Sequence, residues 1–127
     1  MLPAEDKPLY HTANSMASNL LVALLHQAGL LLQDTGIELP DPKEALLPLV
    51  QRTLQNVKIF DTSGALTGPL ARGDEETVAL QMEALRGYPR ALGIYCELGL
   101  AALETARAGN TIDERSYQRI RALLEGK

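Results

Sequence analysis

The stretch NLLVALLHQAGLLLQ, residues 19–33, is the feature that most restricts the fold of this 127-residue chain. Residues 20–25 are apolar on every side of a helix, so a helix formed here must be covered nearly all round. Aromatic residues make up only 4% of the chain, with no Trp and one Phe, so the core must be built from Leu, Ala, Val and Ile. Such a composition favours helices over strands, and an all-α fold is predicted.

Hydrophobic periodicity and capping signals predict about five helices in a single helical domain covering residues 1–127. The first is expected over about 9–35, ending before Gly36, and the second is expected to kink at its internal Pro48. Residues 58–73 are predicted to form a loop. The remaining three helices are expected to begin after Asp74, to span 89–108, and to follow the sequence GNTIDE.

Helix caps and apolar stripes define the expected inner faces. Asp41 and Asp74 are predicted N-caps, and Thr111 with Glu114 has the spacing of a capping box. Two apolar stripes are expected to face the core: Leu46, Leu49, Val50, Thr53, Leu54 and Val57 in the second helix, and Val78, Met82 and Leu85 in the third.

The fourth predicted helix carries only a narrow polar stripe, because its charged residues Arg90, Glu97 and Glu104 are spaced by seven. Such a stripe indicates burial nearly all round the helix. The first and fourth helices are therefore both expected to be long and buried. A five-helix monomer can cover one such helix more easily than two, so a homodimer with an extensive interface is predicted.

Charge and cysteine content exclude several classes of protein. The net charge is −4 and no basic face stands out, which argues against binding to nucleic acid or to an anionic membrane surface. The apolar stretch is interrupted by His26 and two glutamines and is too short to span a bilayer, so no membrane partner is expected. A single cysteine, Cys96, allows no intrachain disulfide, favours the cytoplasm, and is predicted to lie in the core.

A polar patch on the first predicted helix is the first candidate site. At 100° per residue, His11, Ser15, Ser18 and Asn19 fall within about a third of the helix circumference. These side chains could be satisfied buried polar groups, an exposed N-terminal turn, or the lining of a pocket in which His11 exchanges a proton near neutral pH. His26 lies on the same face, fifteen residues after His11, where a structural or interfacial role is favoured.

The loop segment ALTGPLARGD, residues 65–74, is the second candidate site. Thr67, Gly68 and Pro69 predict a tight turn that brings backbone close to another group. Arg72 can bind a carboxylate or phosphate with its planar guanidinium, or can form an ordinary surface ion pair. Asp74 is best explained as a helix cap, with ligand binding as the alternative.

Neither a metal site nor a dinucleotide site is indicated by the residues. His11 and His26 are too far apart on one helix to share an ion, and no HxxxH or CxxC spacing exists. There is no βαβ unit with a glycine-rich turn, so no cofactor is expected for this chain alone.

Three segments in order resemble a known family: KPLYHTANSMASNLLVAL, LLPLVQRTLQN and GALTGPLARGDEETV. The chain resembles domain of unknown function 2520 over about residues 7–108. This family is similar to the C-terminal-like group of 6-phosphogluconate dehydrogenase, which includes pyrroline-5-carboxylate reductase and ketopantoate reductase. The resemblance implies a helical bundle that follows a Rossmann-like domain, which is absent from these residues.

Several functional expectations come from that resemblance. It implies an NAD(P)-dependent oxidoreductase in which the helical domain dimerises and closes the substrate side of a cleft, with NADP or NAD held by the Rossmann-like domain in cis or in trans. His11 and Asn19 would be catalytic, and a small-molecule substrate would contact Ser15, Ser18, Thr67, Gly68, Arg72 and Asp74. Pro69 and Gly73 are carried over from the same loop motif.

Two readings of another class stay open. The chain could be a non-catalytic helical dimerisation or regulatory module, with the polar face as structural hydrogen bonding and Arg72 as an ion-pair partner. It could also bind a partner helix through the apolar faces of its first and fourth helices, which would leave a large apolar patch exposed on the monomer.

Overall fold

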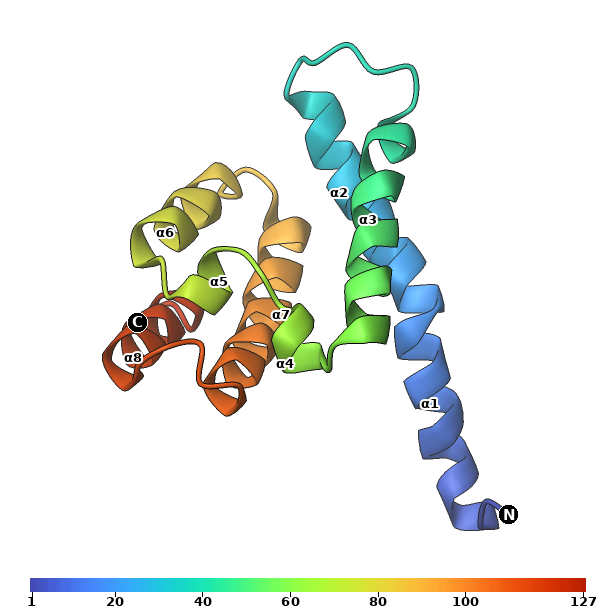
Figure 1. Ribbon diagram of the computed structural model, residues 1–127. Coiled ribbons are helices and arrows are strands. Elements are labelled where there is room, and N and C mark those ends of the chain that lie inside the picture. The colour runs from blue at the N-terminus through green and yellow to red at the C-terminus, as the bar shows by residue number, and fades with distance from the viewer. The chain divides into compact units, whose positions relative to one another are not determined.

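The computed structural model describes all 127 residues, and every regular element in it is a helix (Figure 1). The all-α prediction is confirmed. The chain divides into two compact units, residues 1–50 and 51–127, and the division falls within helix α3, Pro42–Ile59. Each unit is described by itself below.

The N-terminal unit begins with a short 3-10 helix, η1, Ala4–Asp6, followed by α1, Lys7–Ala17, and α2, Asn19–Asp34. The continuous helix predicted over 9–35 is therefore interrupted at Ser18, where φ is −119° and ψ is −74°. Hydrogen bonds from Ser18 N to Asn14 O and from Val22 N to Ser18 O still bridge this point. The interruption is a local distortion, and the order of residues around the helix is retained across it. Gly36 follows at φ 78°, as expected for a residue that ends a helix.

Helix α3 begins as the sequence predicts and runs through its internal proline. The side chain of Asp41 accepts a hydrogen bond from Lys43 N at 3.1 Å and so caps the helix. The predicted inner stripe of α3 is only partly covered: Leu46 and Val50 are half-buried, whereas its other four members, Leu49, Thr53, Leu54 and Val57, are exposed. The helix forms, but none of the six residues is fully buried.

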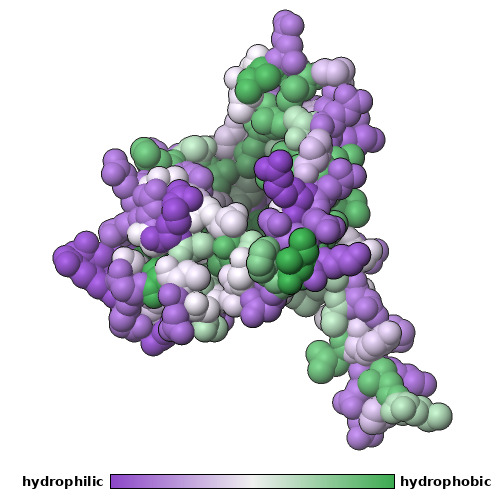
Figure 2. Space-filling model, in the orientation of Figure 1, coloured by the Kyte–Doolittle hydropathy of each residue, from purple (hydrophilic) through white to green (hydrophobic).

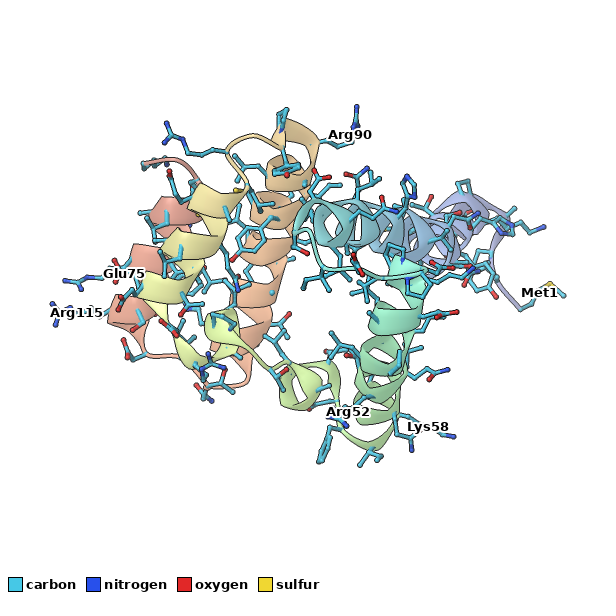
Figure 3. All side chains as sticks on the ribbon, turned by 90° about the horizontal axis from the view of Figure 1, so that it is seen from above. Met1, Arg52, Lys58, Glu75, Arg90 and Arg115 are labelled. Carbon is cyan, nitrogen blue, oxygen red and sulfur yellow. The ribbon has the colours of Figure 1, made fainter.

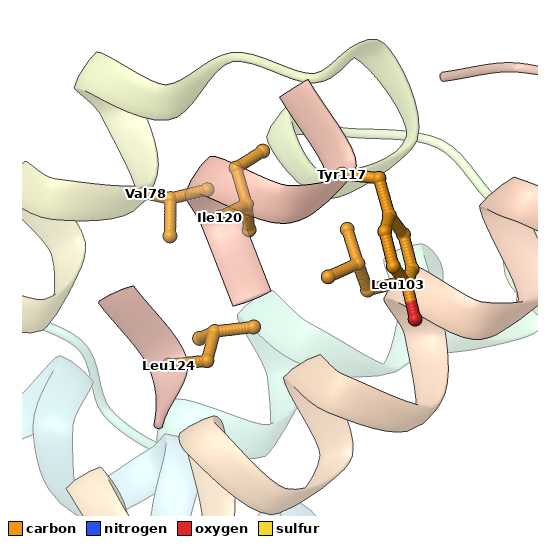
Figure 4. Packing of buried hydrophobic residues seen from close by; sticks show 5 residues of the cluster. All are labelled: Val78, Leu103, Tyr117, Ile120 and Leu124. Carbon is orange, nitrogen blue, oxygen red and sulfur yellow. The ribbon is translucent and has the colours of Figure 1, made fainter. Parts of the chain in front are cut away.

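The C-terminal unit contains the hydrophobic core, which lies between α6, Glu75–Ala84, α7, Pro89–Ala108, and α8, Glu114–Leu124. Five buried side chains form its centre: Val78, Leu103, Tyr117, Ile120 and Leu124 (Figure 4). Charged side chains lie on the outside of this bundle, where Glu75 and Arg115 point away from the core (Figure 3). The predicted inner face of the third helix is confirmed, since Val78 and Leu85 are buried and Met82 packs against the core.

Two one-turn helices, α4 at Thr62–Ala65 and α5 at Pro69–Arg72, occupy the segment that was predicted as loop. Helix α5 packs against α6 and α7, and α4 packs against α7. Ala65 and Ala71 are buried, so this connection is part of the packed unit. The loop prediction was wrong here because apolar residues at a few positions are enough to dock single turns against α7.

The capping box predicted for the last helix is also corrected. Asp113 caps α8, accepting a hydrogen bond from Ser116 N at 2.8 Å. The Thr111 hydroxyl instead donates to the carbonyl of Ala106 at the end of α7. The error was one of position: Asp113 directly precedes the first helical residue, and Thr111 lies two residues too early.

The first and fourth predicted helices are not buried all round within this chain. Helices α1 and α2 contain no buried residue, and α7 buries only Ala91, Gly99, Leu103 and Ala106. Figure 2 shows hydrophobic residues on the surface at the lower right, where Figure 1 places α1. The stretch Ala4–Asp34 is also long and apolar enough, by length and composition alone, to cross a membrane. Core helices of soluble proteins and signal sequences meet the same criterion.

Candidate functional site

The predicted polar patch lies around the junction of α1 and α2. His11 and Ser15 belong to α1, Ser18 is the junction itself, and Asn19 begins α2. Because the hydrogen-bond ladder bridges Ser18, the spacing of four, seven and eight residues from His11 keeps these positions on one side of the helix. The structure therefore brings together the four residues that the sequence grouped.

All four side chains of this patch are exposed. The ring of His11 meets that of Tyr10 edge to face, with 5.6 Å between ring centroids. By contrast, the neighbouring Thr12 hydroxyl is occupied, since it donates to the carbonyl of Pro8 at 2.8 Å. The chain contains no buried polar side chain, so the interpretation of the patch as a satisfied buried network does not apply to this chain by itself.

The glycines of the loop motif have conformations that explain their presence. Gly68 has φ 89° and ψ −172°, a region essentially limited to glycine, and it directly precedes Pro69, the first residue of α5. Gly73 ends α5 in the left-handed conformation, with φ 69°. A Cβ on Gly73 would lie 3.0 Å from the Cβ of Ser116 in α8. The predicted close approach of backbone to another group thus exists at Gly73, and the group is α8.

Asp74 is the N-cap of α6, as predicted. Its carboxylate accepts hydrogen bonds from Thr77 N at 3.1 Å and from the Thr77 hydroxyl at 2.7 Å. These bonds hold the pKa of Asp74 below the ordinary value of 3.8, and the nearby charge of Arg72 adds to the effect. With both oxygens already engaged, Asp74 is mainly a structural residue of this loop.

Arg72 is the charged residue of the loop whose side chain extends into solvent. Its side chain is 62% exposed, and its Nη2 lies 3.6 Å from a carboxylate oxygen of Asp74. An exposed ion pair of this length contributes little to stability, so the guanidinium can exchange this partner for a ligand anion. Thr67 is also exposed, one residue before the Gly68 turn.

The two candidate groups lie in different compact units: the polar patch in the N-terminal unit and the loop motif in the C-terminal unit. The expectation that residues of both groups contact one substrate stays a prediction. All residues of each group belong to a single unit, so each group can be tested by itself.

A groove that the sequence did not indicate lies in the N-terminal unit, between α2 and the beginning of α3. Its volume is about 360 Å³, and it is lined mainly by apolar side chains, with Val22, Leu25, Gly29 and Leu30 from α2 and Pro42 and Leu47 from α3. His26 and Gln33 of α2 also line it, as do the charged residues Asp41 and Lys43 at the beginning of α3. The sequence did single out His26, because it lies on the same helix face as His11. Nothing in the sequence indicated that α3 would form the opposite wall.

The remaining chemistry-bearing residues fit structural roles. Cys96 packs against the hydrophobic core, as predicted, and burial raises the pKa of its thiol. The described residues contain no group of three or more His, Cys, Asp or Glu side chains that could hold a metal ion. Because the chain has no strand, it cannot form a βαβ unit, and its residues do not fit a Rossmann-type dinucleotide site.

Comparison with known protein families gives a match over most of the chain. No curated protein and no solved structure is significantly similar to the chain. The family model described as Domain of unknown function (DUF2520) matches residues 1–102, which include the polar patch, the groove and the loop motif. The chain therefore belongs to the DUF2520 family.

Proposed function

We propose that this chain is the substrate-side and dimerisation domain of an NAD(P)-dependent oxidoreductase. A Rossmann-like domain, in cis or in trans, would hold the NADP or NAD cofactor, because the residues of this chain do not fit a dinucleotide site. The likeness of the family to the C-terminal-like group of 6-phosphogluconate dehydrogenase, noted from the three sequence motifs, supports this assignment. The cytoplasm is the compartment proposed for such an enzyme.

The observation that carries the proposal is the exposure of the polar patch. His11, Ser15, Ser18 and Asn19 share one side of a helix whose other residues are largely apolar, and all four are exposed. A set of polar groups with no structural role in its own chain is available to a substrate. In this role His11 and Asn19 orient a carbonyl or imine, and His11 donates or accepts a proton near neutral pH.

Arg72 supplies the second part of the proposal. Its guanidinium is exposed and bound only to Asp74 at 3.6 Å, so it can anchor an anionic group of a small-molecule substrate. Asp74 caps α6, and Gly73 lies so close to α8 that an added Cβ would be 3.0 Å from the Cβ of Ser116. Together they hold the backbone that carries Arg72.

The test is steady-state kinetics of the two-domain enzyme formed by this chain with its dinucleotide-binding domain. His11→Ala and Arg72→Ala should each lower kcat/KM by more than about tenfold. Thr12→Ala is the matched control for His11→Ala, because the Thr12 hydroxyl donates to the carbonyl of Pro8 in the same helix. Arg86→Ala is the matched control for Arg72→Ala, because Arg86 forms a similar exposed ion pair with Glu83. Kinetics unchanged in both His11→Ala and Arg72→Ala would remove the catalytic assignment.

A non-catalytic dimerisation or regulatory module is the alternative, and specific features of the loop favour it. Gly68, Gly73 and Asp74 all have conformational or capping roles that explain the motif without a ligand. On this alternative, Asp74→Ala changes stability, whereas Arg72→Ala changes neither stability nor any activity. The same kinetic experiment therefore decides between the two functions.

A further inference from the structure

Helix α1 begins with a lysine that neither candidate group includes. Residues 8–33 contain no Asp, Glu, Lys or Arg, so Lys7 is the only formally charged residue between Asp6 and Asp34. Lys7 is the first residue of α1, and its φ of −58° and ψ of −43° are helical. The helical repeat therefore applies from Lys7 onward, and its position can be compared with that of the polar patch.

Lys7 lies on the side of the helix that carries the patch. It precedes His11 by four residues, which turns it by only about 40° about the helix axis and separates the two residues by about 6 Å along it. Ser15 and Asn19 follow His11 on the same side, each a further four residues along. The patch thus continues toward the N-terminus of α1 and ends in a cation.

The ammonium group of Lys7 has no partner within the chain. Its side chain is exposed, and none of the ion pairs of the structure includes it, although Glu5 and Asp6 directly precede it. Lys43, the only other Lys or Arg of residues 1–50, is paired with Asp41 at 3.5 Å. A cation at the first residue of a helix also lies at the positive end of the helix dipole, where it does not stabilise the helix. Lys7 is therefore available to an anion from outside the chain.

The residues that follow Lys7 make it the sole source of charge selectivity in the patch. Residues 8–33 bring no carboxylate that would repel an anion and no second Lys or Arg that could replace Lys7. The hydroxyl groups of Ser15 and Ser18 and the carboxamide of Asn19 are uncharged. Replacing Lys7 by a neutral residue thus removes the whole formal charge of this side of the helix.

We propose that Lys7 holds the anionic group of the substrate whose carbonyl or imine meets His11 and Asn19. This inference rests on the proposed function and deepens it by naming the substrate class. That class is a small oxo or imino compound with a carboxylate or a phosphate a few bonds from the reacting carbon. Lysine forms charge-assisted hydrogen bonds with both anions. Because one helix carries Lys7 and His11, their spacing is set within the N-terminal unit, whereas Arg72 belongs to the other unit.

The first test is an NMR titration of the full 127-residue chain with levulinate, a keto acid whose ketone and carboxylate are joined by a short alkyl chain. Levulinate should shift the amide resonances of Lys7, His11 and Asn19, and the uncharged levulinamide should bind more weakly. Lys7→Gln should raise the dissociation constant of levulinate at least about fivefold, as expected for the loss of a charge-assisted hydrogen bond. Lys58→Gln is the matched control and should leave this constant unchanged, because Lys58 is likewise exposed and outside every ion pair of the structure.

A second titration with hydroxyacetone phosphate distinguishes the two anions. Tighter binding of this compound than of levulinate assigns Lys7 to a phosphate, and the reverse assigns it to a carboxylate. Equal binding of levulinate and levulinamide would overturn the inference, as would equal effects of Lys7→Gln and Lys58→Gln or the absence of any shift with either anion. Circular dichroism should show unchanged helix content in both variants, because both lysines are exposed.

Kinetics of the two-domain enzyme, with the tighter-binding of the two anions as substrate, separate this inference from the proposed function. Lys7→Gln should raise KM more than it lowers kcat, because Lys7 contacts a part of the substrate that does not react. An unchanged KM in Lys7→Gln together with lost activity in His11→Ala would overturn the inference and leave the proposed function intact. Unchanged kinetics in both His11→Ala and Arg72→Ala would instead end the proposed function.

Discussion

The two units of this chain are both helical, but they use their apolar residues in opposite ways. In the C-terminal unit, apolar positions of α6, α7 and α8 converge on a core in which Val78, Leu103 and Ile120 are fully buried. In the N-terminal unit, α2 has more apolar than polar residues, yet no residue of α1 or α2 is buried. An amphipathic helix has one apolar face, which its neighbours in the same unit can cover. A helix that is apolar all round needs neighbours on every side.

The comparison also separates the two candidate sites. The loop motif sits within the packed unit and is held by α5, α6 and α8, so its glycines and Asp74 have structural explanations. The polar patch lies on the N-terminal unit, which has no buried residue, and all four of its side chains are exposed. The residues that the chain itself does not use are the better candidates for function.

Truncating a leucine in each unit should give the largest difference between them. Leu103 is 1% exposed in the core of the C-terminal unit, whereas Leu20 is 57% exposed in α2. Leu103→Ala should lower the free energy of unfolding by about 2–5 kcal/mol, because it removes buried methyl groups and leaves a cavity. Leu20→Ala, measured by the same urea titration at a concentration where the chain is monomeric, should lower it by less than about 1 kcal/mol. Equal losses would contradict the contrast between the units.

Replacing two glycines of the C-terminal unit by alanine should change the free energy of unfolding by a smaller amount, and in opposite directions at the two positions. Gly73 has φ 69° and its Cβ would lie 3.0 Å from Ser116, so Gly73→Ala should destabilise by about 1–3 kcal/mol. Gly93 lies within α7 with open space around its Cβ position. Gly93→Ala should be neutral or stabilise by up to about 1 kcal/mol, because alanine favours helix. Thermal unfolding of both variants measures the difference.

The smallest effect is expected in the pH dependence of the C-terminal unit. Hydrogen bonds from the backbone and side chains lower the pKa of the three N-cap carboxylates Asp61, Asp74 and Asp113 below 3.8. Their stabilising contribution is therefore complete above pH 3.8 and is lost as the pH falls through the lower folded-state values. The melting temperature of the wild type should drop in this range.

Asp74→Asn keeps an acceptor at the cap but does not titrate. Its melting temperature should depend less on pH below 3.8 than that of the wild type, while Asp74→Ala should be less stable at neutral pH. If Asp74→Asn and the wild type lost stability equally on acidification, the cap carboxylate would not be the titrating group responsible.

Local sequence patterns were enough to predict the helical class, the boundaries of α7, and the caps at Asp41 and Asp74. These depend on periodicity and on hydrogen bonds between residues two or three positions apart, which are local properties of the chain. The grouping of His11, Ser15, Ser18 and Asn19 on one side of a helix is of the same kind. It follows from the helical repeat, and the distortion at Ser18 leaves it intact.

Which apolar helices are covered depends on packing between segments that are distant in the sequence. Leu49, Leu54 and Val57 form as regular a stripe as Val78, Met82 and Leu85, yet only the second stripe packs into the hydrophobic core. The docking of α5 and the groove between α2 and α3 were likewise outside the reach of the sequence. The physical reason is that hydrophobic burial has no direction: a pattern shows that a face must be covered, whereas the packing of distant segments determines what covers it.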